Sequence, residues 1–427
     1  MDHTPKEYDI IIIGGGIAGL YKAYQILNKH KKTQPNILLL ESTNRLGGRI
    51  QTYRDTTYKN GIEAGAGRFH KGHKHLIRLI HKLGLDHLIT KIQTKKQYIP
   101  SPNTPTPKQD SNKYINQVIQ ESKHTPISKL QKQTFLQYAS QVLPHDTPNP
   151  SQVILNSFGY SSELTDMNAY DTIQLIENHY NQSTYYGLKG GMEQIVIKLV
   201  EILKQYPNFQ YHLREPAIKI IPITTPIQTN TSIIIEIKTP KSTYTAKTCI
   251  CTIIKEDLIK IPLFKHAAKD LNLQCIKNLP LCRIYTKFPQ DPDTNEVWFQ
   301  GLKKMTTNTN LRYIIPINPE EGTMMVSYTD NTYSDYWYRI YTTKGVRELN
   351  KELQQELQKI FPEKKIPIPT HTKMFYWKHG VAYYQPGFDS TKDLKKIRQP
   401  FQNIPIFIYG ENYSEKNPQW IEGALEG

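Results

Sequence analysis

Residues 8–20 read Tyr-Asp-Ile-Ile-Ile-Ile-Gly-Gly-Gly-Ile-Ala-Gly-Leu, and this stretch decides the fold expected for the chain. Its run of four isoleucines predicts a strand that is buried on both faces. Gly14, Gly16 and Gly19 follow at G-x-G-x-x-G spacing, which permits a tight turn, close approach of a pyrophosphate to the backbone, and close packing of the next helix, in that order. The stretch therefore predicts the first turn of a dinucleotide-binding βαβ unit.

The residues after this turn agree with a dinucleotide site. A helix is expected over residues 17–29, with its first amides, at Ile17 and Ala18, facing the phosphates. Residues 37–40, Ile-Leu-Leu-Leu, predict the second strand, and Glu41 closes it at a distance that suits a carboxylate bound to the ribose hydroxyls. An acid here also repels a 2′-phosphate. A glycine turn that binds nothing would not require this acid, so we favour the dinucleotide site.

Residues 45–52, Arg-Leu-Gly-Gly-Arg-Ile-Gln-Thr, narrow the cofactor to one class. They resemble the R-x-G-G-R-x-x-T signature of the flavin-containing amine oxidase superfamily, where it extends the FAD pyrophosphate site. Two arginines and two glycines supply charge and close backbone approach. A solvated basic loop would explain neither the paired glycines nor their distance from Glu41. The cofactor-binding residues implied in this region are Ser42, Arg45, Gly47, Gly48 and Arg49.

The length of the chain indicates two domains. At 427 residues it is too long for one compact core. The resemblance implies an α/β (α+β two-domain) fold, in which a FAD-binding Rossmann-like domain is interleaved with a mixed sheet-plus-helices substrate domain. We expect the FAD domain to comprise residues 1–85, 186–256 and 400–427, and the substrate domain residues 86–185 and 257–399.

The chain is basic, with a formal net charge of +16. Such a surplus attracts nucleic acid or anionic substrates, but the lysines are scattered and no nucleic-acid-binding motif accompanies them, so we do not expect nucleic-acid binding. The four cysteines lack zinc spacing, and a disulfide framework is not expected. Abundant Ile, Lys, Asn and Tyr suggest an AT-rich genome, as in several lineages that include large DNA viruses.

The chain enters its first strand within ten residues, and no apolar run approaches the roughly twenty residues that cross a bilayer. We therefore expect a soluble, cytoplasmic protein without a signal peptide or membrane contact. If the gene is viral, a location in the virion stays open as an alternative. The sequence leaves open whether the protein forms a homodimer.

An arginine after a glycine-containing loop carries a second resemblance. Arg68 is followed by Phe69 and, five residues after the arginine, by His73. This pattern resembles the L-amino-acid oxidase branch of the superfamily, which includes the tryptophan monooxygenases, and it implies that Arg68 grips the substrate carboxylate. That branch usually has proline where this sequence has His70. The residues of this loop that the resemblance implies at the cofactor are Gly65, Ala66, Gly67 and Arg68.

Two other interpretations of this segment stay open. Arg68 could form a structural ion pair with a neighbouring acid, because buried arginines are often paired in this way. His70, His73 and His75 could present several imidazoles to one metal ion. A helix start explains these histidines and no carboxylate or thiolate lies adjacent in sequence, so we predict no metal site.

The middle of the chain extends the resemblance. Residues 188–194, Leu-Lys-Gly-Gly-Met-Glu-Gln, resemble the second glycine signature of the superfamily, which returns the chain to the flavin domain. The strands after it reach the adenine in the family, which implies a backbone contact at Ala217 or Ile218. Residues 279–289 resemble the strand that carries, in monoamine and polyamine oxidases, a lysine holding a water against flavin N5. Arg283 stands there instead, and because arginine cannot act as a base, that route of flavin reoxidation is in doubt.

A segment near the C-terminus resembles one that lines the active site in the family. It spans residues 377–387, contains Trp377 and Tyr383, and ends in proline-glycine. Monoamine oxidases attach FAD to a cysteine in this region. Since this segment contains no cysteine, we expect non-covalent FAD.

The last residues complete the superfamily's closing signature. Gly410 and Glu411 follow a predicted buried strand, and the resemblance implies that Glu411 meets the flavin ribityl or pyrophosphate. Trp420 and Ile421 are also implied at the cofactor, with Trp420 beside the isoalloxazine. The alternative for Trp420 is a tryptophan of the hydrophobic core, but the matching residues around it and the need of a cofactor pocket for aromatic side chains favour the flavin site.

Together these resemblances imply a FAD-dependent oxidoreductase that oxidises a primary amine, most simply an L-amino acid. The imine would hydrolyse to an oxo acid and ammonia, and O2 would be reduced to H2O2. The catalytic residues expected are Arg68, Arg283, Trp377, Tyr383 and Trp420. One alternative is a monoamine or polyamine oxidase, although the positive charge disfavours a polycation. Another is a flavin-loaded or empty scaffold with a structural or nucleic-acid-associated role.

Overall fold

The structure of the protein is a computed structural model. It describes residues 5–29, 34–92, 96–102, 104–105, 110–145, 148–180, 184–227 and 230–426, with the backbone alone described at 225–227 and 230–232. The chain forms two compact units. Unit 1 consists of Met1–Ile92, Thr184–Lys277 and Phe388–Gly427, and unit 2 consists of Gln93–Ser183 and Asn278–Gly387.

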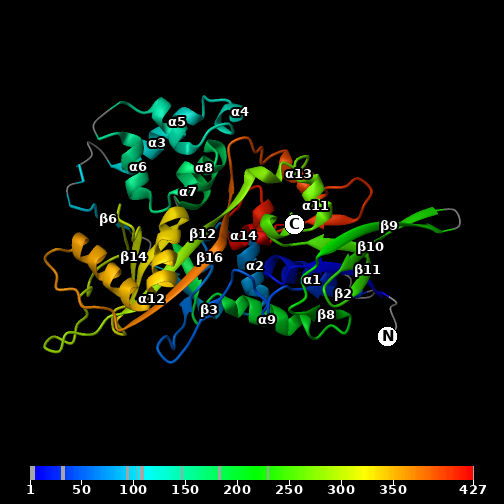
Figure 1. Ribbon diagram of the computed structural model, residues 1–427, viewed down its shortest axis with the longest axis horizontal. Helices are drawn as coiled ribbons and strands as arrows, with labels where there is room; N and C mark the ends of the chain where they lie inside the picture. The colour runs from blue at the N-terminus through cyan, green and yellow to red at the C-terminus, as the bar shows by residue number, and fades with distance from the viewer. Residues whose placement is uncertain are drawn as a thin grey trace. The chain divides into compact units, whose positions relative to one another are not determined.

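Unit 1 is built on a seven-stranded sheet (Figure 1). Its strands, in spatial order, are β8 (Phe209–His212), β2 (Ile37–Leu40), β1 (Lys6–Ile13), β11 (Thr243–Cys251), β10 (Asn230–Lys238) and β9 (Lys219–Ile227), with β17 (Ile406–Ile408) beside β11. Strands β8, β2, β1, β11 and β17 pair in parallel, and β10 pairs antiparallel with β11 and β9. The parallel part is the doubly wound arrangement predicted from the glycine turn.

The core of unit 1 explains why β1 and β2 are inner strands of this sheet. Ile12 and Leu39 pack in one cluster with α1 (Ile17–Lys29) and α9 (Glu193–Leu203), which contribute Leu20 and Leu199 among others. Alternate residues of both strands point to the opposite face and are equally buried. Strands covered on both faces require continuous apolar runs, and the isoleucine and leucine runs supply them.

Shorter elements complete unit 1. They are β3 (Thr52–Tyr53), β4 (Ile62–Glu63), α2 (Lys74–Lys82), η1 (Asp86–Leu88), β5 (Ile89–Ile92), β7 (Tyr185–Leu188), α10 (Lys255–Leu258), α11 (Pro262–Ala267), η3 (Leu273–Cys275), α13 (Asp393–Arg398), η4 (Glu411–Tyr413) and α14 (Ile421–Ala424). Strand β5 pairs antiparallel with β7, so the chain leaves unit 1 and returns to it on adjacent strands.

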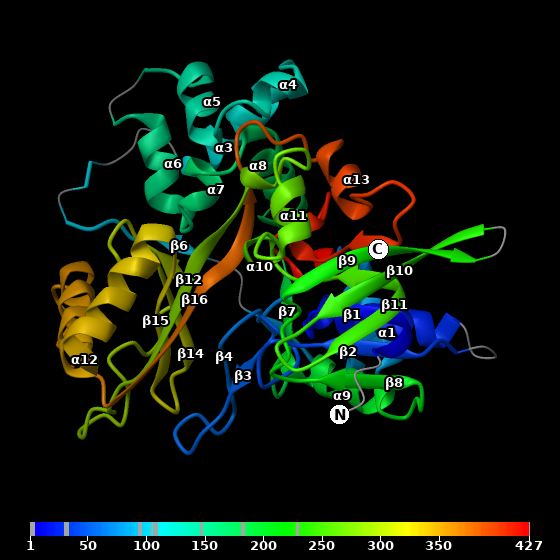
Figure 2. The ribbon, with the colours of Figure 1, turned by 45° about the vertical axis from the view of Figure 1, so that its right-hand side comes forward.

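Unit 2 combines a six-stranded sheet with helices. The sheet order is β16 (His371–Tyr384), β12 (Ile276–Lys287), β15 (Thr323–Asp330), β14 (Tyr313–Asn318), β13 (Met305–Thr306) and β6 (Gln97–Tyr98). Helix α12 (Asn331–Ile360) packs on this sheet, as Figure 2 shows, and is interrupted at Gly345, whose φ is +80°. A separate helical core is formed by α3 (Ser111–Ser122), α4 (Ile127–Leu130), α5 (Phe135–Val142), α6 (Pro150–Phe158), α7 (Ser162–Thr165), α8 (Ala169–Leu175) and the π-helical turn η2 (Ile176–Tyr180).

The unit boundaries differ from the predicted domain boundaries for identifiable reasons. The expected break after residue 85 would separate β5 from its partner β7, and the pairing of these strands keeps both in unit 1. At the C-terminal side, α13 packs against β17, so unit 1 resumes at Phe388 and not at residue 400. Among the described residues, every helix is too short or too polar to cross a lipid bilayer.

Candidate active site

The glycine turn lies at the carboxyl end of β1, as the sequence predicted. Gly14 has φ +109°, and its amide donates to the carbonyl oxygen of Leu40 at 2.8 Å. A Cβ atom on Gly19 would lie 2.1 Å from the carbonyl oxygen of Gly14, so no other residue fits at the start of α1. The first turn of α1 therefore approaches β1 closely and directs its free amides to the end of the strand, where an anion binds favourably.

The second glycine loop lies directly against the first. The amide of Gly47 donates to the carbonyl oxygen of Gly15 at 2.8 Å. A Cβ on Gly16 would meet the Cα of Gly48 at 3.9 Å as its nearest neighbour, so the space between the two loops is bounded by backbone atoms. Backbone of this kind fits a pyrophosphate.

Glu41 is buried at the end of β2 and accepts two backbone hydrogen bonds. Oε2 accepts from the amide of Gly15 at 2.7 Å, and Oε1 accepts from the amide of Thr43 at 2.7 Å. The hydroxyl of Ser42 lies 3.4 Å from Oε1. Oε2 accepts one of these bonds and can accept a second from a ribose hydroxyl, so this geometry fits the predicted contact.

The two arginines of the second loop have different partners. The guanidinium of Arg45 donates to the carbonyl oxygens of Leu46 at 3.3 Å and Ile50 at 3.4 Å, and also to that of Gly48, so it shapes its own loop. Arg49 Nη2 instead pairs with Oε2 of Glu411 at 2.6 Å.

The predicted loop 65–67 joins the second glycine loop through the backbone. The amide of Ala66 donates to the carbonyl oxygen of Arg49 at 2.9 Å, and a Cβ on Gly65 would lie 1.9 Å from that oxygen. Gly65, Ala66 and the following Gly67 therefore lie beside the predicted pyrophosphate loops.

Glu411 is buried, and its carboxylate accepts hydrogen bonds from Arg49, Asn412 and Gln419. The amide of Gln419 donates to it at 2.7 Å, and Nδ2 of Asn412 donates to it at 2.9 Å. Gly410, just before it, has φ +127°. The direct flavin contact expected of Glu411 stays a prediction, and the ion pair links this residue to the glycine loop of Arg49.

Three of the predicted residues lie elsewhere in unit 1. Ile421 packs in the core with α1. Ala217 and Ile218 precede β9, and the amide of Ile218 already donates to the carbonyl oxygen of Lys238 at 2.8 Å. An adenine contact at this position would therefore need the carbonyl of Ala217 or Ile218.

Arg68 lies over two aromatic rings. Its Cζ is 4.9 Å from the ring centre of Tyr185 and 5.5 Å from that of Trp420, within the range of cation–π contacts. The two rings are nearly parallel, at 3°, with centres 6.1 Å apart. These three residues come from segments that are far apart in sequence. Arg68, Tyr185 and Trp420 are called the Arg68 cluster below.

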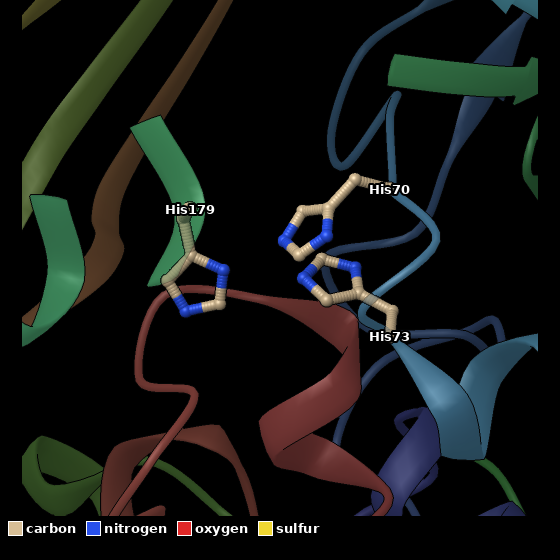
Figure 3. A group of neighbouring side chains, drawn as sticks. All are labelled: His70, His73 and His179. Atoms are coloured by element: carbon tan, nitrogen blue, oxygen red, sulfur yellow. The ribbon is translucent and has the colours of Figure 1, made fainter. Parts of the chain in front are cut away.

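His70 and His73 lie beside this cluster, side by side with ring centres 3.8 Å apart (Figure 3). The ring centre of Trp420 is 5.8 Å from that of His70 and 4.9 Å from that of His73. Burial, helped by the charge of Arg68, lowers the pKa of His70 to about 4, so this imidazole is neutral near pH 7. Its Nδ1 accepts from the amide of Gly72 at 3.0 Å, which leaves the proton on Nε2.

The remaining predicted residues belong to unit 2. Arg283, on β12, donates to the hydroxyl of Tyr328 at 3.2 Å and lies 4.4 Å from the centre of its ring. Tyr383 is buried, and burial raises its pKa well above the usual value. Trp377 is half-buried on β16.

Two residues that belong to the Arg68 cluster or hold the segments around it were not predicted. Tyr185 precedes the second glycine signature but shows no motif of its own, and its role depends on the pairing of Phe69 with Tyr186. Glu422 lies within the closing signature, yet its partners are the amides of His75 and Leu76, at 2.9 Å each. Both contacts join segments that are far apart in sequence.

The doubly wound sheet, the two glycine loops and the buried acid define a dinucleotide-binding protein. More narrowly, the chain belongs to the flavin containing amine oxidoreductase family, whose sequence model matches residues 17–427. The cofactor is therefore FAD, and Gly14, Gly16, Gly48 and Glu41 have the geometry to hold it.

Individual relatives differ in what they act on. An uncharacterized protein of Acanthamoeba polyphaga mimivirus is 23% identical over 98% of this chain and 92% of its own length. The L-amino-acid oxidase of Mus musculus is 35% identical over 20% of this chain and 13% of its own. Putrescine oxidase bound to putrescine superposes with a TM-score of 0.74, covering 98% of this chain and 96% of that one at 15% identity. At that identity the likeness shows the fold alone.

Proposed function

We propose that the protein oxidises an L-amino acid. The observation that supports this substrate class is the Arg68 guanidinium, which Tyr185 and Trp420 flank at 4.9 and 5.5 Å. A planar guanidinium matches the two oxygens of a carboxylate and can bind them through two parallel hydrogen bonds, and the two rings add cation–π contacts to it. The net charge of +16 also favours an anionic group over a polycation.

In this proposal unit 1 holds FAD and unit 2 supplies the substrate domain. The amides of the glycine turn hold the pyrophosphate, and Glu41 holds a ribose. Bound FAD would supply a two-electron acceptor for the hydride on the carbon that bears the amine, and O2 would then receive these two electrons, together with the proton of the hydride and the proton lost from the amine nitrogen, to give H2O2. The imine adds water and releases ammonia, leaving an oxo acid.

The chain's own residues bind and orient the substrate. Arg68 fixes the carboxylate, and the Trp420 ring limits how the substrate can turn. Neutral His70 places no second positive charge beside Arg68, so the amine does not meet additional repulsion. For Arg283, Trp377 and Tyr383, which belong to unit 2, a catalytic role stays a proposal.

A peroxide-coupled screen of FAD-loaded protein tests the proposal. The panel contains the twenty amino acids, simple monoamines and polyamines, with heat-treated protein as the control for background peroxide. Turnover of one or more amino acids, and little of the corresponding amines without a carboxylate, is the expected result. Turnover of polyamines but of no amino acid would assign the protein to the alternative substrate class. A flavin-loaded protein that oxidises nothing in the panel would favour a non-catalytic role.

A further inference from the structure

Trp420 lies in a short segment that is fastened at both ends. On its N-terminal side, the amide of Gln419 donates to Oε1 of Glu411 at 2.7 Å, and Gln419 has φ +73°, which is unfavourable for a residue with a side chain. On its C-terminal side, the two oxygens of Glu422 accept from the amides of His75 and Leu76, each at 2.9 Å. The backbone is thus fixed on either side of the Trp420 ring.

The partners of Glu422 belong to the first turn of α2. First-turn amides have no acceptor within their own helix, and the helix dipole favours an anion beside them. Glu422 is only 3% exposed, so its carboxylate and these amides depend on each other. Because α2 begins directly after His73, this contact also fixes the end of the loop that contains Arg68 and His70.

The position of Tyr185 relative to Arg68 is set by contacts that do not involve Glu422. The amide of Phe69 donates to the carbonyl oxygen of Tyr186 at 2.8 Å, and the amide of Tyr186 donates back to Phe69 at 2.7 Å. This backbone pair sets the distance between Arg68 and Tyr185. The two aromatic rings near Arg68 are therefore held by different contacts: Tyr185 by the backbone pair of Phe69 and Tyr186, and Trp420 by the hydrogen bonds of Glu422.

We propose that Glu422 is a positioning residue for the substrate: by fastening the first turn of α2 to the Trp420 segment, it sets the gap between the Arg68 guanidinium and the Trp420 ring. The predicted effect of Glu422 on substrate binding rests on the function proposed above. Its predicted effect on the distance between Arg68 and Trp420 does not depend on that function. Glu422→Ala removes both acceptor oxygens, and Glu422→Gln retains one of them.

The test compares FAD-loaded wild-type protein with Glu422→Ala, Glu422→Gln and Asp110→Ala. Asp110 is the matched control, because its carboxylate caps α3 in unit 2 by accepting from the amide of Asn112. In Glu422→Ala, KM for the amino acid should rise about 10-fold or more, with kcat changed less and FAD affinity within about twofold of wild type. Glu422→Gln should lie between, and Asp110→Ala should leave KM unchanged.

Two measurements do not need turnover. Hydrogen exchange at the amides of His75 and Leu76 should accelerate in Glu422→Ala. The near-ultraviolet circular dichroism of Trp420, identified from its loss in Trp420→Phe, should weaken as well. Faster exchange with an unchanged Trp420 signal and an unchanged KM would overturn the proposal, because Glu422 would then only stabilise the helix. If wild-type protein oxidises no amino acid, the proposed substrate fails, while an altered Trp420 signal still supports the positioning role and an unchanged one refutes it.

Discussion

Replacing Glu41 with alanine should weaken FAD binding strongly. A hydrogen bond to a charged acceptor contributes about 1.5–3 kcal/mol, so loss of the ribose contact should raise the dissociation constant of FAD about 10- to 150-fold. The structure adds a second effect, since Glu41 also accepts the buried amide of Gly15 at 2.7 Å. Leaving that donor without its acceptor should lower the free energy of unfolding of the FAD-free protein by about 1–3 kcal/mol.

Asp9→Ala is the matched control for this experiment. Asp9 also accepts a backbone amide in the same sheet, that of Asn36 at 2.9 Å, but it lies toward the other end of β1 from the glycine turn. Asp9 is partly exposed, and its ion pair with Lys247 lies at the surface, where water screens it, so the pair should contribute little to stability. FAD titration followed by fluorescence quenching, with chemical unfolding of the FAD-free variants, separates the two effects. An FAD dissociation constant of Glu41→Ala within twofold of wild type, alongside a clear loss of stability, would show that Glu41 only braces the turn.

Three further predictions concern the substrate arginine, the neutral histidine and the attachment of the flavin. Arg68→Lys should raise KM for the amino acid at least about 10-fold with normal FAD content, because an ammonium cannot reproduce the planar fork; equal KM values would return Arg68 to a structural role. The lowered pKa of His70 means that the unfolded state binds more protons than the folded state between about pH 6.5 and pH 4. The free energy of unfolding should therefore be fully retained above pH 6.5 and fall by about 3 kcal/mol as the pH is lowered to 4. His70→Asn should flatten this part of the curve of unfolding free energy against pH, and an unchanged slope would contradict the shift. Acid precipitation should release all the flavin into the supernatant, whereas a yellow pellet would show covalent attachment.

The dinucleotide half of the fold could be predicted because its signals are local. The isoleucine strand, the turn at Gly14 and the acid Glu41 lie within one short stretch, and each residue has a single geometric purpose there. Glu41 also accepts the amide of Gly15, so the acid and the glycine turn support each other.

The residues that were missed depend on tertiary contacts. No local signal marks the first half of α12, because its tyrosines, threonines and tryptophan have weak helix propensity. Burial of Trp337 and Ile340 in the core of unit 2 stabilises this half instead. Glu422 and Tyr185 contact residues in other segments of the chain, and no local sequence pattern predicts these contacts. Local motifs therefore indicate where the glycine loops lie, whereas only the tertiary fold brings Tyr185 and Trp420 next to Arg68.

The pairing of β5 with β7 has a consequence for how the chain can vary in length. Ile92 lies opposite Tyr185, so the ninety or so residues between them leave and return at a single point of unit 1. The entropy of closing a flexible loop grows only with the logarithm of its length, by about 0.6 kcal/mol for each doubling. Lengthening or shortening this excursion would thus scarcely alter the folding free energy of the dinucleotide half, which leaves the helical block free to diverge among relatives while the glycine loops keep their geometry.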